Sequence, residues 1–87
     1  MSAARKLERN KRDKKGSVGE RVREARMQAG LSQRECAIHC GLTQDTISRI
    51  ERDVSMPYES TLEILAQVLK RPVFWLRYGG SLVKRGR

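Results

Sequence analysis

The chain has 87 residues and a net charge of +9, and no stretch approaches the roughly 20 apolar residues of a membrane span. The length suits one small domain, and two cysteines do not make a secreted disulfide framework. Because no apolar segment follows the first charged residues, we expect no signal peptide and a cytoplasmic protein. No residue set typical of an enzyme is evident, so we expect no catalysis.

The positive charge is concentrated at the two ends. Residues 1–16 contain seven Lys or Arg and two acidic residues, residues 81–87 contain three basic residues, and residues 17–80 are nearly balanced with nine basic and eight acidic residues. Segment 1–16 has almost nothing large and apolar to bury, so we expect a flexible basic arm. We expect a folded domain over 17–80 and a basic tail over 81–87. Basic ends suit a polyanion such as nucleic acid, although a solubilising role for the arm stays open.

Helical periodicity begins at Ser17 and ends at Gly30, with one apolar stripe formed by Val18, Val22, Ala25 and Ala29. Ser32 and Glu35 then form the sequence pattern of a capping box, which predicts the start of a second short helix. Gly41 ends that helix. Thr43 offers another N-cap, and a third helix is expected from about Gln44 to Arg52. The inward residues of these two helices are Cys36, Ala37, Cys40, Ile47 and Ile50.

Residues 53–57 are expected to form a loop, since Pro57 disfavours helix at the residue before it. Ser60 and Glu63 suggest a further capping box, followed by a clean apolar stripe of Leu62, Leu65, Ala66 and Leu69. Pro72 suits the first turn of a fifth helix, which Gly79 and Gly80 would close. No segment alternates with a period of two, so we predict an all-α fold without strands.

Two short capped helices joined by Gly-Leu-Thr have the pattern of a helix-turn-helix, in which Ala37 must be small and Gly41 must adopt a left-handed conformation. The segments GLSQRECAIHCGLTQDTISRIERD and LEILAQVLKRPVFWL resemble the phage repressor and Cro family, the XRE-type regulators. The resemblance covers about residues 18–78. It implies a compact five-helix, lambda-repressor-like DNA-binding domain.

The resemblance places the third helix in the major groove, with Gln44, Asp45 and Arg49 as the base-contacting residues. Their chemistry agrees: Gln pairs with adenine, Asp accepts from cytosine, and Arg donates to guanine. Asp45 has an alternative role, since it can instead favour the helix N-terminus electrostatically. The resemblance also implies a phosphate contact by Gln33. Further contacts to the DNA backbone are expected from Ser32, Thr43, Thr46, Ser48 and Arg52.

Arg26 and Glu51 match a family pair that forms a partly buried salt bridge, so we expect a structural role for both; two independent surface charges are the alternative. Cys36, His39 and Cys40 share a helix face and could be zinc ligands. A fourth ligand is not evident, so we predict no metal and no cofactor.

Three residues depart from the family pattern. Asp53 and Lys70 stand where glycine is frequent, and Asp53 is therefore expected to adopt a left-handed conformation or to loosen the turn. Ile38 is apolar where a polar residue is usual. An exposed Ile38 or Phe74 would suggest a partner contact, although single exposed apolar residues are common.

These features predict a sequence-specific transcriptional regulator, and we expect a repressor, that binds a double-stranded DNA operator as a homodimer. The resemblance implies a dimer interface around Val73, Phe74, Trp75 and Tyr78. The alternatives are an antitoxin that binds a toxin, a protein-interaction adaptor, or the DNA-binding part of a longer regulator.

Overall fold

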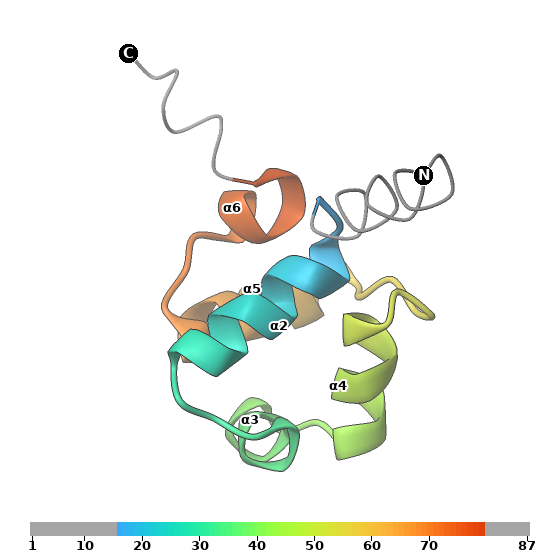
Figure 1. Ribbon diagram of the computed structural model, residues 1–87, viewed down its shortest axis with the longest axis vertical. Coiled ribbons are helices and arrows are strands. Elements are labelled where there is room, and N and C mark those ends of the chain that lie inside the picture. The colour runs from blue at the N-terminus through green and yellow to red at the C-terminus, as the bar shows by residue number, and fades with distance from the viewer. Residues whose placement is uncertain (1–15, 80–87) are drawn as a thin grey trace, which may run out of the picture.

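The computed structural model describes residues 16–79, which form five α-helices: α2 (Val18–Gln28), α3 (Gln33–Cys40), α4 (Gln44–Glu51), α5 (Glu59–Leu69) and α6 (Val73–Tyr78). Figure 1 shows α3 and α6 at opposite ends of the bundle, with α2 and α5 between them. Within 16–79 there is no strand, so the predicted all-α fold is confirmed. None of these five helices has the length and apolar character needed to cross a membrane. The predicted arm (apart from Gly16), Gly80 and the predicted tail lie outside the described residues.

The hydrophobic core draws side chains from all five helices. Burying a Val, Leu or Ile side chain contributes roughly 1.5–3 kcal/mol relative to leaving it exposed. This burial holds the short helices together. The core residues are Val18, Val22, Ala25, Cys36, Ala37, Cys40, Ile47, Ile50, Leu62, Leu65, Ala66, Leu69 and Leu76.

Side-chain caps begin the first three helices of the described region. The hydroxyls of Ser17, Ser32 and Thr43 accept the backbone N–H groups of Glu20, Glu35 and Thr46. At α3 the predicted capping box is complete, because the Glu35 carboxylate also accepts the Ser32 N–H at 2.8 Å. The polar residues at these starts therefore fix where each helix begins.

Three details of the sequence prediction were wrong. Ser60 does not cap α5: the helix begins at Glu59, and Tyr58, extended after Pro57, is the N-cap without a side-chain hydrogen bond. Ala29 is exposed, because the last helical residue is Gln28 and the chain turns away from the core there. Pro72 is the N-cap of α6 and does not lie in its first turn.

The loop after α4 is tied to the start of α2. Asp53 adopts the left-handed conformation (φ 61°), one of the two outcomes expected there, and its Oδ1 accepts the Gly19 N–H at 3.1 Å. Gly19 lies against the backbone at the end of α4, because a Cβ at this position would lie 2.3 Å from the Ile50 carbonyl oxygen. The backbone of α4 therefore packs directly on the first turn of α2, which fixes how α4 is presented.

Candidate nucleic-acid interface

The α3–α4 unit is a rigid frame. Gly41 ends α3 with φ 73°, the left-handed conformation that the sequence required, and the Leu42 N–H bonds back to the Ala37 carbonyl at 2.9 Å. Ala37 is buried in the core, and Ile47 and Ile50 anchor the inner side of α4. One side of α4 is thus fully engaged with the core.

The opposite side of α4 is a polar edge in solvent. Gln44, Asp45 and Arg49, the three predicted base readers, are all exposed. Arg49 Nε donates to Asp45 Oδ2 at 2.9 Å, a pairing across one helical turn that the sequence analysis had not anticipated. We call Gln44, Asp45 and Arg49 the outer edge of α4.

The predicted phosphate-contacting residues already take part in local hydrogen bonds. Ser32 and Thr43 cap α3 and α4, and the Thr43 and Thr46 hydroxyls lie 2.9 Å apart. Ser48 Oγ accepts from Arg52 Nε at 3.2 Å. Arg52 is the C-cap of α4 and is exposed. These side chains therefore already have hydrogen-bond partners within α3, α4 and their caps.

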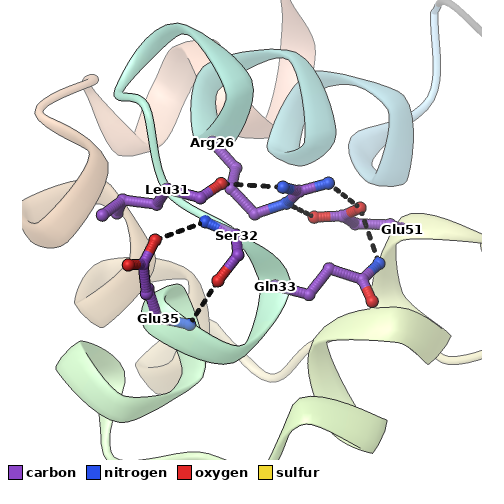
Figure 2. Close-up of polar contacts among 6 residues, drawn as sticks. All are labelled: Arg26, Leu31, Ser32, Gln33, Glu35 and Glu51. Atoms are coloured by element: carbon purple, nitrogen blue, oxygen red, sulfur yellow. Dashed lines mark hydrogen bonds and ion pairs between the residues drawn. The ribbon is translucent and has the colours of Figure 1, made fainter.

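Glu51 joins three helices through its carboxylate (Figure 2). Its two oxygens accept from Arg26 Nε at 2.6 Å and Arg26 Nη2 at 3.1 Å, and Oε1 also accepts from Gln33 Nε2 at 3.1 Å. Arg26 Nη1 donates to the Leu31 carbonyl at 2.8 Å. The hydrogen bond to Glu51 raises the pKa of Arg26 above its already high ordinary value, so the cation persists. The bond from Gln33, which the sequence analysis missed, fixes the amide of a predicted phosphate contact.

Arg21 is a structural residue that the sequence analysis missed. Its guanidinium is buried and donates to the carbonyls of Leu76 (2.9 Å), Arg77 (2.7 Å) and Gly16 (2.6 Å). It therefore joins the start of the described chain to the last turn of α6, whose free carbonyls favour a cation. Burial lowers the pKa of Arg21, and the nearby Asp53 opposes this shift. A basic residue three positions after Val18, on the core stripe, was the available signal.

Cys36 and Cys40 are free and buried. Burial raises the pKa of the Cys36 thiol to about 12 and also raises that of Cys40, so both remain protonated near neutral pH. His39 is exposed, and no group of three or more potential ligands occurs among residues 16–79. The two cysteines act as small core residues.

The four predicted dimer residues divide into two sets on α6. Val73 and Trp75 are partly buried and pack against the core. Phe74 and Tyr78 are 50% and 57% exposed, and their rings form an edge-to-face pair with centroids 4.8 Å apart. Arg71 lies over the Trp75 ring at 5.3 Å. Helix α6 lies at the end of the bundle opposite α3 (Figure 1). Its exposed Phe74 and Tyr78 therefore form an aromatic surface.

A sharp Gly41 turn between two short helices, a buried inner side of α4 and an exposed polar outer edge define a helix-turn-helix domain. The chain belongs to the helix-turn-helix domain family, whose model matches residues 17–73. The predicted resemblance to XRE-type regulators is confirmed by relatives and solved structures.

The relatives include the HTH-type transcriptional regulator PuuR of Escherichia coli (strain K12), which is 50% identical over 50 residues. The PuuR of Shigella flexneri matches equally well. These matches cover 58% of the chain but 27% of the relatives' length, so the chain spans about a quarter of the curated relatives it matches.

The solved structures confirm the lambda-repressor-like fold. One is the P22 c2 repressor in complex with synthetic operator 9T, with a TM-score of 0.70, 27% identity, and coverage of 72% of this chain and 96% of that chain. Another is SinR, described as the master regulator for biofilm formation, in complex with DNA; its TM-score is 0.65 at 32% identity, covering 68% of this chain and 95% of that chain.

Proposed function

We propose that this chain is a sequence-specific transcriptional regulator, acting as a repressor, that inserts α4 into the major groove of a double-stranded DNA operator. One observation carries the proposal: the outer edge of α4 is polar and exposed, while Ile47 and Ile50 on its other side are buried in the core. A helix anchored in this way has the rigidity that base recognition requires. The similarity to P22 c2 repressor and SinR, both solved with DNA, supports this function.

The outer edge supplies suitable chemistry for base readout. The Gln44 amide can donate to and accept from adenine, and the Arg49 guanidinium can donate to guanine O6 and N7. A good bidentate pair of either kind is worth about 1–3 kcal/mol of discrimination. Asp45 lies on the same edge and can accept from cytosine, although its carboxylate is already paired with Arg49.

Phosphate contacts would set the register of α4. The N-termini of α3 and α4, capped by Ser32 and Thr43, direct backbone N–H groups toward an anion. Gln33 bonds to Glu51 through Nε2, and a primary amide has a second N–H that can donate to a phosphate oxygen. Thr46, Ser48 and Arg52 are further candidates.

We propose that the regulator acts as a homodimer through α6. The exposed aromatic surface of Phe74 and Tyr78 supports this interface. Val73 and Trp75, which pack against the core, would hold α6 in place beneath that surface. A two-fold dimer of this kind would bind two half-sites about one helical turn apart.

The basic segment 1–15 would neutralise further DNA phosphates. Deleting it should then make the logarithm of the binding constant less steep against the logarithm of salt concentration, by about 0.9 for each phosphate that the segment neutralises. An unchanged slope would remove this segment from the mechanism.

PuuR is described as a transcriptional regulator, P22 c2 as a repressor and SinR as a master regulator in complex with DNA, and this favours regulation over the antitoxin or adaptor alternatives. The deciding experiment selects bound sequences from random duplex DNA at physiological salt. The wild-type chain should yield a defined two-half-site motif. The double variant Gln44→Ala/Arg49→Ala, which changes only exposed residues, should fold normally and lose that motif. A protein-interaction adaptor would keep its function in the double variant. A wild-type chain that selects no motif would refute the proposal.

A further inference from the structure

Two arginines, Arg49 on α4 and Arg52 at its C-cap, are held in the same way, each by an acceptor four residues earlier. Arg49 Nε donates to Asp45 Oδ2 at 2.9 Å, and Arg52 Nε donates to Ser48 Oγ at 3.2 Å. Both hydrogen bonds use Nε and neither uses the terminal nitrogens. In each pair the acceptor therefore engages Nε and leaves the donors of the two terminal nitrogens available to another acceptor.

We propose that Asp45 is a positioning residue that sets the base specificity of Arg49, and that it does not read a base of its own. This inference rests on the proposed function. With Nε bonded to Asp45, the two terminal nitrogens form the parallel pair of donors that fits guanine O6 and N7. Guanine, approached end-on by Arg49, is the base that this arrangement selects.

The charge and mobility of the pair both support a positioning role. The side chains of Arg49 and Asp45 are 53% and 71% exposed, so without a partner Arg49 would sample many rotamers. Holding it in place before binding avoids an entropy cost equivalent to about two- to tenfold in affinity. The neighbouring cation also offsets the repulsion that the Asp45 carboxylate meets near DNA phosphates.

The Ser48–Arg52 pair provides a matched control within the same helix. Its geometry is similar, but the acceptor is a neutral hydroxyl and Arg52 lies at the other end of α4, as the C-cap. Arg52 is a proposed phosphate contact. Freeing it with Ser48→Ala should therefore change affinity evenly across operator sequences, without altering the preference for any one base.

The test measures binding of wild type, Asp45→Ala, Asp45→Asn, Arg49→Ala, Ser48→Ala and the double variant Asp45→Ala/Arg49→Ala. The probe is the selected operator with each base pair substituted in turn, at one salt concentration. Arg49→Ala should reduce the preference for guanine at one position by about 5- to 150-fold. Asp45→Ala should relax the same position by about two- to tenfold and leave the others unchanged.

Two further results separate positioning from direct readout. The double variant should match Arg49→Ala alone, because Asp45 would act only through Arg49. Asp45→Ala should also bind unrelated duplex more tightly, since a negative charge is removed, while Asp45→Asn, which retains a neutral acceptor, should relax the guanine position less than Asp45→Ala.

The inference is overturned if Asp45→Ala relaxes a different position from Arg49→Ala, which would make Asp45 a reader, or if it relaxes none. If Arg49→Ala alters no position at all, the proposed readout by α4 fails and the inference fails with it. A thermal unfolding curve for each variant confirms that the substitution has left the fold intact.

Discussion

Two arginine–carboxylate pairs involve α4, and they differ in burial and in what they connect. Arg26–Glu51 joins α2 to α4, with side chains 11% and 3% exposed, whereas Arg49–Asp45 lies within α4 and is largely in solvent. Removing one partner of a buried ion pair is strongly destabilising, because the other charge is left buried and unpaired. An exposed pair contributes little to stability. The same chemistry therefore supports the fold on the inner side of α4 and, in our proposal, recognition on the outer edge.

The largest expected effect comes from breaking the buried pair. Glu51→Ala leaves the Arg26 guanidinium without its carboxylate and Gln33 without its acceptor, so the free energy of unfolding should fall by about 3 kcal/mol. Urea denaturation would measure it. The apolar pair Arg26→Met/Glu51→Leu is the control and should lose less. A loss below about 1 kcal/mol for Glu51→Ala would place this pair in the same class as an exposed one.

A second substitution tests the close contact between α2 and the end of α4. In Gly19→Ala the new methyl would lie against the Ile50 carbonyl oxygen and Asp53, and the backbones would have to separate. We expect a loss of about 1–3 kcal/mol in the free energy of unfolding, despite the better helix propensity of alanine. An increase in stability would show that the two backbones can separate here at little cost.

Substitutions at two serines compare an N-cap that the structure shows, Ser32, with a predicted N-cap that it does not show, Ser60. Ser32→Ala removes the hydroxyl that accepts the Glu35 N–H, and should cost about 1 kcal/mol. Ser60→Ala, inside the first turn of α5, should change stability by less than about 0.5 kcal/mol. Equal losses in thermal denaturation would revive the capping box predicted at Ser60.

A smaller, pH-dependent effect belongs to Glu35. Accepting the Ser32 backbone N–H lowers the pKa of Glu35, so its contribution to stability is present above the unfolded-state pKa and is lost as pH falls through the lowered folded-state pKa. The stability difference between wild type and Glu35→Ala should therefore shrink on acidification. A difference that grew as pH fell would contradict this assignment.

The smallest effect on stability is expected at the exposed pair. Asp45→Ala breaks a solvated pair across one helical turn, and the free energy of unfolding should change by no more than about 0.5 kcal/mol. Calorimetry on this variant and on Glu51→Ala makes the comparison direct. A loss at Asp45 as large as that at Glu51 would mean that the outer edge is part of the fold.

The fold was predictable because local signals agreed with one another. Apolar spacing located the inner side of each helix, and Gly41 and the caps at Ser32 and Thr43 set the helix-turn-helix. The prediction failed at Ser60 because a capping pattern is local, whereas Pro57 and Tyr58 determine where α5 begins. Ala29 fitted the helical spacing but lies one residue beyond the helix.

The exposure of the candidate site residues was predictable, but the hydrogen bonds among the residues around them were not. Gln44, Asp45 and Arg49 could be assigned to an exposed edge from their spacing relative to Ile47 and Ile50. The bond from Gln33 to Glu51 and the carbonyl contacts of Arg21 depend on how distant segments meet, and no local pattern specifies that. The Asp45–Arg49 pairing could have been anticipated from its spacing of four residues.

The most direct test of the central claim is methylation interference on the selected operator. Dimethyl sulfate methylates guanine N7, which lies in the major groove and is an acceptor that Arg49 would use. We predict that methylation of one guanine in each half-site blocks binding of the wild-type chain and has no effect on Arg49→Ala. Interference that is absent from the major groove, or that Arg49→Ala leaves unchanged, would contradict recognition by the outer edge of α4.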